Sequence, residues 1–367
     1  MVVNRRGIAL SMMSTMSAIV VVLACSVALV AQRKDDKKDD KKQSDAQKKE
    51  ILDIVKIVDA AAVGQAATND FGLSWVHEDY LKATANKEYV PFTVTFDASK
   101  ATSPNVALYW RVVAKDAAAP TATLTLPAKK DDKKDDKKPA PAPKYAYEDI
   151  NFVPVTAAQG ATARLSRAFT VTAGTYDVYV VMKEPASAQK NASAPKVSVV
   201  KQTITVPDFW SQELNTSSVI VASRIEPLAA PLSANEQIER PYALGMMEIV
   251  PTTDLKFSTK GELSVFMLIY NPKVDAMNKP DVTVEYNFYQ KPSGAPEKFF
   301  NKTSPQPLNG TTLPPAFDMS LGHQLQTGQA VPLASFPAGD YRLEIKVTDK
   351  LSTKSLTRDV NFTVTAG

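Results

Sequence analysis

The side chains that could do chemistry are few and widely spaced in this sequence. The chain has two histidines, His77 and His323, and a single cysteine, Cys25. His77 lies in the stretch SWVHEDY, where Glu78 and Asp79 could orient its imidazole for general-base chemistry. A lone surface histidine beside acidic residues is common, however. We therefore expect both histidines to be structural and not catalytic.

The patterns of familiar catalytic and metal sites are also missing. A zinc or iron site needs clustered histidine, cysteine and carboxylate ligands, which two isolated histidines cannot supply. The sequence has no Gly-x-Ser-x-Gly elbow, no phosphate-binding glycine loop and no dinucleotide-binding fingerprint. We expect a non-enzymatic protein with no catalytic residue, no cofactor and no metal. The 39 Asp and Glu residues leave one alternative open, because the carboxylate pair of a glycoside hydrolase is recognised by its separation in space.

The N-terminus predicts export. Two arginines at residues 5–6 precede a mainly apolar run over residues 8–31, which is the pattern of an export signal. Three outcomes remain open. The signal is cleaved after Ala28 or Ala31, or residues 8–31 are retained as a membrane anchor, or Cys25 in the lipobox-like VLAC is lipidated. Each outcome places the bulk of the chain outside the cytoplasm, in the periplasm or at the cell surface.

The charge block KDDKKDDKK occurs twice, at residues 34–42 and 130–138. Its like charges recur at i,i+4, where they destabilise a helix, and three prolines over residues 139–143 follow the second copy. We expect both copies to be disordered spacers. The alternating signs nearly cancel over a Debye length of about 8 Å. The net charge of the chain is only +4, so a nucleic-acid partner is not expected.

Helical periodicity is predicted for residues 44–62. The apolar residues with this spacing are Ile51, Ile54, Val55, Val58 and Ala62. A bare apolar stripe is unfavourable in water. We therefore expect this amphipathic helix to dock on the domain that follows, with docking on a partner as the alternative.

From residue 90 onward the hydrophobic period changes to two. The alternating runs include residues 92–96, 106–112, 176–182, 282–288, 341–347 and 360–364. Many short alternating strands without intervening helices predict an all-β protein built from antiparallel sandwiches. We expect two tandem immunoglobulin-like β-sandwiches, over residues 65–209 and 210–367, after a spacer and helix over residues 32–64.

The second charge block falls inside the first expected sandwich. Residues 71–115 alone offer two or three strands, which is too little for an independent domain. Long insertions in surface loops cost little closure entropy. We therefore expect residues 116–144 to be a disordered loop insertion of the first sandwich.

An internal sequence similarity links the two expected sandwiches. AGTYDVYVVMKE at residues 173–184 matches AGDYRLEIKVTD at residues 338–349, and each is followed by one more strand. Gly-x-Tyr at the start of the penultimate strand resembles the tyrosine corner of immunoglobulin and fibronectin type III domains. We expect Tyr176 and Tyr341 to be structural, with the ring in the core and the hydroxyl bonded to nearby backbone.

Residues 216–364, with SSVIVASRIEPL, LSVFMLIYNP and VTVEYNFYQ, resemble the C-terminal β-sandwich of uncharacterised exported bacterial proteins. These include von Willebrand A-related and GWxTD-type proteins, and the whole chain resembles an uncharacterised exported acidobacterial family. The resemblance implies a sandwich and no activity. The chain lacks a GWxTD motif. In Asp318-Met-Ser320-Leu-Gly322, a glycine stands at the third position of the metal-binding DxSxS pattern.

These observations favour an exported binding or scaffolding protein of the cell envelope, with an unidentified protein or envelope partner. The alternative is an extracytoplasmic carbohydrate-active enzyme or an accessory carbohydrate-binding module. A cleft with two facing carboxylates and an aromatic floor would favour the alternative. A mixed surface with an exposed sheet edge would favour an interaction module.

Overall fold

The computed structural model describes residues 45–115, 145–155, 162–187, 193–252 and 254–367. The expected export signal, the first charge block and the insertion at residues 116–144 lie outside these described residues. So does Cys25.

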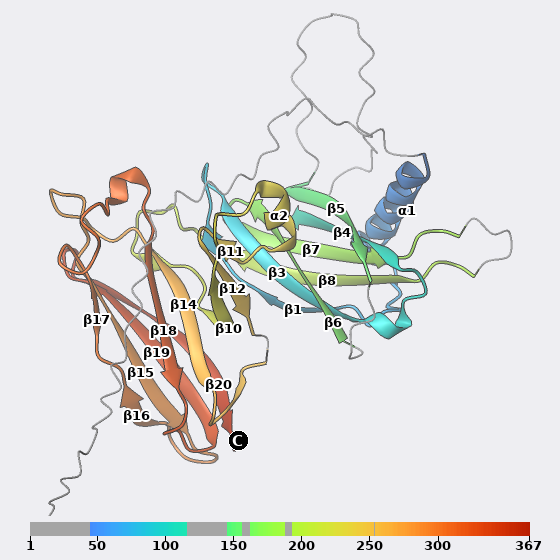
Figure 1. The fold of residues 1–367 in the computed structure, drawn as a ribbon. Coiled ribbons are helices and arrows are strands. Elements are labelled where there is room, and N and C mark those ends of the chain that lie inside the picture. The colour runs from blue at the N-terminus through green and yellow to red at the C-terminus, as the bar shows by residue number, and fades with distance from the viewer. Residues whose placement is uncertain (1–44, 116–144, 156–161, 188–192, 253) are drawn as a thin grey trace, which may run out of the picture.

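The all-β sandwich class is confirmed, and the strands form two sandwiches of two sheets each (Figure 1). In the first sandwich, one sheet contains β1 (Ser74–Glu78), β2 (Leu81–Lys82), β3 (Glu88–Asp97) and β6 (Thr162–Val171). The opposite sheet has the order β5 (Tyr147–Pro154), β4 (Asn105–Ala114), β7 (Gly174–Lys183) and β8 (Val197–Val206). β4 and β5 pair directly, so residues 115–146 connect two adjacent strands of one sheet.

The second sandwich has two larger sheets. One has the order β11 (Ala243–Leu244), β12 (Met247–Pro251), β10 (Ile220–Pro227), β14 (Glu262–Tyr270) and β18 (Leu325–Pro332), with β9 (Asn215–Thr216) also on β14. The other has the order β13 (Lys256–Ser258), β20 (Lys354–Thr365), β19 (Gly339–Asp349), β15 (Val282–Lys291) and β16 (Lys298–Lys302), with β17 (Gln306–Leu308) also on β15. Short 3-10 turns lie at η1 (Ala98–Lys100) and η2 (Met319–Leu321).

Both sandwiches follow the same path through their sheets. If β2 and the strands β9, β11, β12, β13 and β17 are left out, each sandwich has seven strands. The first, second and fifth of them form one sheet (β1, β3 and β6; β10, β14 and β18), and the other four form the opposite sheet. The fourth strand therefore lies beside the third. In an immunoglobulin constant domain it joins the first sheet instead. The alternating residues predicted from the sequence point into the two cores, as Trp110 does in the first sandwich and Tyr286 in the second.

The tyrosine corners are confirmed in both sandwiches. The Tyr176 hydroxyl donates to the carbonyl oxygen of Thr172 at 2.9 Å, and that of Tyr341 donates to the carbonyl oxygen of Pro337 at 2.8 Å. Both tyrosine rings are buried. In both domains the tyrosine hydroxyl bonds the carbonyl oxygen of the residue four positions earlier. This supports two related domains, as the internal sequence similarity indicated.

The predicted amphipathic helix is α1 (Asp45–Ala62), and it docks on the first sandwich, over the outer face of β4 and β7. Ile54 and Val58 are fully buried there, as predicted. Ile51 and Val55 are only half-buried, and Ala62 is exposed, so the predicted face is rotated relative to the observed one.

Two ion pairs explain why the helix is rotated. Glu50 of α1 lies 2.5 Å from the buried ammonium of Lys183, and Asp59 lies 2.5 Å from the buried guanidinium of Arg111. Both basic residues project from the outer face of the sheet among apolar neighbours. The helix therefore has to present carboxylates as well as apolar side chains to this sheet.

The two sandwiches also pack against each other through outer sheet faces. The buried residues of this layer come from β2 and β3 on one side, from β10, β12 and β14 on the other, and from the loops between them. They are Leu81, Tyr89, Phe209, Ile220, Ala222, Tyr242, Ile249, Phe266, Leu268 and Tyr270. The molecule is thus a stack of four sheets with α1 on one end (Figure 1).

The second α-helix was not predicted. α2 (Ala234–Glu239) is a short helix between β10 and β11. Ser233 caps its N-terminus and exchanges hydrogen bonds with Glu236 in a capping box. The helix is too short to give a hydrophobic period, and the Ser-x-x-Glu spacing was its only sequence signal.

Candidate functional site

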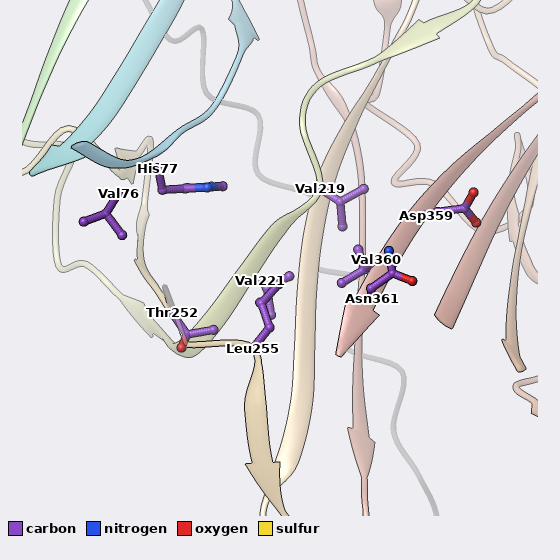
Figure 2. A pocket seen from close by; sticks show the side chains of 9 residues that line it. All are labelled: Val76, His77, Val219, Val221, Thr252, Leu255, Asp359, Val360 and Asn361. Atoms are coloured by element: carbon purple, nitrogen blue, oxygen red, sulfur yellow. The ribbon is translucent and has the colours of Figure 1, made fainter. Parts of the chain in front are cut away.

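A cavity of about 280 Å³ lies where β1 of the first sandwich faces β10 and β20 of the second (Figure 2). Its lining is mainly aliphatic, with a few polar groups. The lining residues are Val76, His77, Val219, Val221, Thr252, Leu255, Asp359, Val360 and Asn361. This cavity brings His77 next to residues almost three hundred positions further along the chain.

His77 is held by a buried carboxylate. Its Nε2 lies 3.0 Å from Oδ2 of Asp79, and the hydroxyl of Tyr242 donates to the same oxygen at 2.8 Å. The hydrogen bond to Asp79 raises the pKa of His77, against an opposing effect of burial. Burial raises the pKa of Tyr242 well above its ordinary value, so the phenol stays protonated and donates. The sequence indicated Asp79 as a partner of His77 but gave no sign of Tyr242.

This arrangement orients an imidazole but supplies no nucleophile. Within the described residues, no hydrogen bond joins His77 to a serine, threonine or cysteine side chain. Glu78, the other predicted partner, instead accepts hydrogen bonds from the indole of Trp75 at 2.6 Å and the hydroxyl of Tyr80 at 3.1 Å. His77 is therefore available for binding, with its charge supported by Asp79.

The second histidine has a local role. Nδ1 of His323 accepts the backbone N–H of Asp318 at 3.0 Å, and the ring packs against Phe317. The Asp318 carboxylate accepts from the backbone N–H of Ser320 at 2.7 Å and from its hydroxyl at 2.6 Å, so it caps η2. The side chains of the DxSxS-like stretch thus stabilise a local turn. Among the described residues, no group of three or more His, Cys, Asp or Glu side chains could hold a metal ion.

A second polar group of the interface was missed by sequence reasoning. Glu88 on β3 is fully buried, and its Oε1 accepts the backbone N–H of Phe209 at 3.1 Å. Its other oxygen, Oε2, has no hydrogen-bond partner in the described structure. Burial raises the pKa of Glu88 to about 7. Glu88 is one of many acids in the sequence, and its hydrogen-bond partner Phe209 lies 121 residues further along the chain, so no local pattern marks it as buried.

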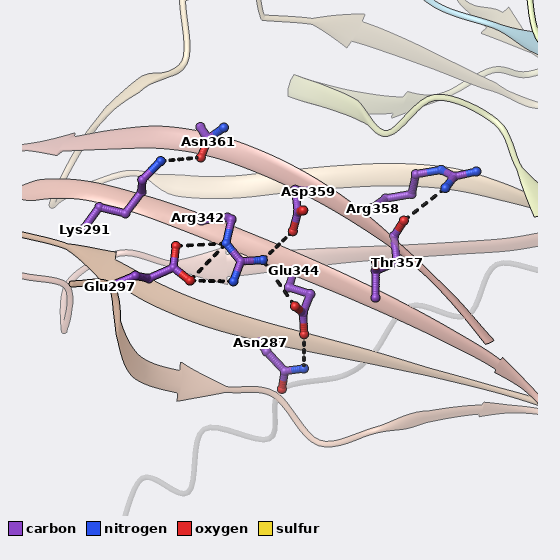
Figure 3. A network of polar contacts seen from close by, with 9 residues as sticks. All are labelled: Asn287, Lys291, Glu297, Arg342, Glu344, Thr357, Arg358, Asp359 and Asn361. Carbon is purple, nitrogen blue, oxygen red and sulfur yellow. Dashed lines mark hydrogen bonds and ion pairs between the residues drawn. The ribbon is translucent and has the colours of Figure 1, made fainter.

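The outer face of β15, β19 and β20 carries a polar network around Arg342 (Figure 3). The guanidinium contacts Glu297 at 2.6 Å, Asp359 at 2.5 Å and Glu344 at 3.2 Å, and it lies over the ring of Tyr289. The hydrogen bond from Arg342 lowers the pKa of Glu297. The three carboxylates therefore surround one arginine and form an ion-pair cluster on this sheet face.

None of the helices in the described part of the chain is long and apolar enough to span a membrane.

No protein-family model matches the chain, and no curated protein matches it. Among solved structures, the chain is similar to trypsin-activated alpha-2-macroglobulin from Escherichia coli, with 10% identity and a TM-score of 0.21. That match covers 82% of this chain and 17% of the macroglobulin chain. Salmonella alpha-2-macroglobulin reacted with methylamine is similar at 12% identity and a TM-score of 0.19, over 81% of this chain and 17% of that one. The chain thus spans about a sixth of these β-rich proteins, and the similarity carries no argument about activity.

Proposed function

We propose that the protein is an exported, non-catalytic binding or scaffolding protein of the cell envelope. Export rests on the arginine pair and apolar run of residues 5–31, which is either cleaved after Ala28 or Ala31 or kept as a membrane tether through residues 8–31 or a lipidated Cys25. The resemblance to exported acidobacterial proteins supports the same compartment. The partner is another envelope component.

The observation that carries the binding role is the composition of the interdomain cavity. Among the described residues that line it, aliphatic side chains predominate, there is no Phe, Tyr or Trp, and the one carboxylate, Asp359, is paired with Arg342. Cleavage of a glycoside needs two carboxylates roughly 5–10 Å apart and a surface for a sugar ring. A cavity of about 280 Å³ is also smaller than the roughly 300–1,000 Å³ of usual small-molecule sites. These features favour contact with another protein over catalysis.

The experiment tests both the location of the protein in the cell and its activity on envelope polysaccharides. The chain is produced in its native host, the cells are fractionated, and the mature N-terminus is determined by mass spectrometry. Cross-linking of intact cells is expected to give adducts with an envelope protein, and the purified chain is expected to release no sugar from envelope polysaccharides. An intact Met1 in the cytosol would refute export. Sugar release that is lost on substitution of one acidic residue would establish the carbohydrate-active alternative.

A further inference from the structure

β20 is an edge strand along most of its length. One side pairs with β19 throughout, but on the other side β13 pairs only with residues 363–365. The backbone N–H of Thr363 donates to the carbonyl oxygen of Leu255 at 2.8 Å, so it points away from β19. Because backbone direction alternates with period two along a strand, the N–H and C=O groups of Asn361 and Asp359 also point away from β19.

Two other edges of the described structure are covered in part. On β8, a bridge between Asn69 and Ser198 and the hydrogen bond from Val199 N–H to the carbonyl oxygen of Thr68 occupy the start of the edge. On β5, the side chains of Asp149 and Asn151 bond the backbone N–H and C=O of Ile150. Such devices keep an edge strand from pairing with another chain.

β20 has this protection at only one point. Arg358 donates to the carbonyl oxygen of Thr357 at 3.0 Å (Figure 3). In the described structure, no hydrogen bond covers the outward backbone groups of Asp359 and Asn361. The open part of the edge therefore begins beyond Thr357 and ends where β13 joins the sheet.

This open edge forms one wall of the interdomain cavity, since Asp359 and Asn361 line it (Figure 2). Val219 and Val221 form an adjacent aliphatic wall, and His77 projects from the first sandwich toward them. Asp79 holds Nε2 of His77, which leaves Nδ1 for a bound chain: it donates to a carbonyl or carboxylate oxygen when the imidazole is protonated and accepts a peptide N–H when it is neutral. Alternate side chains of an extended strand would face these valines.

We propose that residues 358–361 of β20 are a strand-addition site, at which an extended peptide segment of another protein pairs with the sheet beside the interdomain cavity. The segment carries small aliphatic side chains at alternate positions, because the cavity has a volume of only about 280 Å³ and is lined by valines and Leu255. Main-chain hydrogen bonds supply affinity and the apolar wall supplies specificity. The proposal rests on the binding role proposed above and names the class of partner.

The test uses the purified chain and peptides selected against it from a displayed random library. A selected peptide is resynthesised with a fluorescent label, and its Kd is measured by fluorescence polarisation. Asn361→Pro removes an outward N–H without removing a bond to β19, whereas Asn361→Thr keeps the backbone intact and is the matched control. We expect Asn361→Pro to weaken binding by about tenfold or more and Asn361→Thr to leave it unchanged.

A second arm does not depend on the folding of a variant. N-methylation of alternate peptide amides is expected to abolish binding to the unmodified chain. Hydrogen exchange of the amides of Asp359 and Asn361 is expected to slow when the unmethylated peptide binds. The proposal is overturned if the library yields no binder, if N-methylation has no effect, or if these two amides are not protected. A dimer of the chain that Asn361→Pro dissociates would assign the edge to a second copy and overturn the choice of partner.

The two proposals can fail separately. Binding of a peptide at another surface, together with export and envelope cross-links, would overturn the strand-addition site alone. Strand addition by a chain that stays in the cytosol would overturn the proposed function alone.

Discussion

Replacing Tyr341 by phenylalanine and by alanine separates the two contributions of the tyrosine corner. The ring is 0% exposed and packs against Phe300, Phe336 and Phe362, with ring centroids 5.3–5.5 Å away. Truncation to alanine removes these contacts and leaves a cavity, so we expect a loss of about 3–5 kcal/mol in the free energy of unfolding. Phenylalanine keeps the ring and loses only the hydrogen bond to Pro337, a loss of about 1 kcal/mol. Pro337 is exposed, so water can reach its carbonyl and the cost stays low.

The assay is urea denaturation followed by tryptophan fluorescence, with the midpoints of the variants compared. Tyr176 in the first sandwich provides the matched pair, because its hydroxyl also bonds a backbone carbonyl four residues earlier. The same order, with alanine far below phenylalanine, is expected there. If Tyr341→Ala unfolded within about 1 kcal/mol of the unmodified chain, the ring would not be the packed element described here, and the register of β19 would be wrong.

Three further predictions concern ionisable side chains. Glu50→Leu leaves the ammonium of Lys183 buried without its partner, so we expect a loss of about 3–5 kcal/mol in urea denaturation, and the double variant Glu50→Leu with Lys183→Met should recover most of it. The pKa of Glu88 is raised to about 7, so its contribution to stability is complete below its unfolded value of 4.5 and is lost as pH rises through 7. We expect Glu88→Gln to remove up to about 3 kcal/mol of this pH dependence, and an unchanged pH profile of the denaturation midpoint would contradict it. The pKa of His77 is also raised, so the stability from its pairing with Asp79 is fully present below pH 6.5, its unfolded pKa, and is lost as the pH rises through the pKa of the folded state. His77→Gln should therefore flatten this part of the pH profile of the denaturation midpoint.

The strands and the inner faces of both sandwiches could be predicted because a one-sided strand leaves a period of two in the sequence. Trp110 and Tyr286 lie in the cores where the alternation placed them. The outer faces could not be assigned in this way. Tyr179 and Val181 are buried under α1, and Leu268 is buried against the first sandwich, so their strands read as nearly continuous apolar runs. Such a run indicates that both faces are covered but does not identify the covering element.

The candidate site was less predictable than the fold for the same reason. The pairing of His77 with Asp79 is local and was visible in the sequence. Tyr242 and Asn361 approach His77 only because two separate sandwiches pack together. An open backbone edge leaves no side-chain signature at all, since it is defined by where the pairing of β13 stops.

The apolar layer between the sandwiches has a consequence for biogenesis. A chain that emerges N-terminus first can complete the first sandwich when Val206 appears, but the face that covers Leu81 and Tyr89 is not complete until Tyr270 of β14 follows. During that interval the nascent protein presents an aromatic surface to its surroundings. We expect the first sandwich to need a chaperone or the arrival of its neighbour before it is soluble, and the finished molecule to melt in one calorimetric transition, not two.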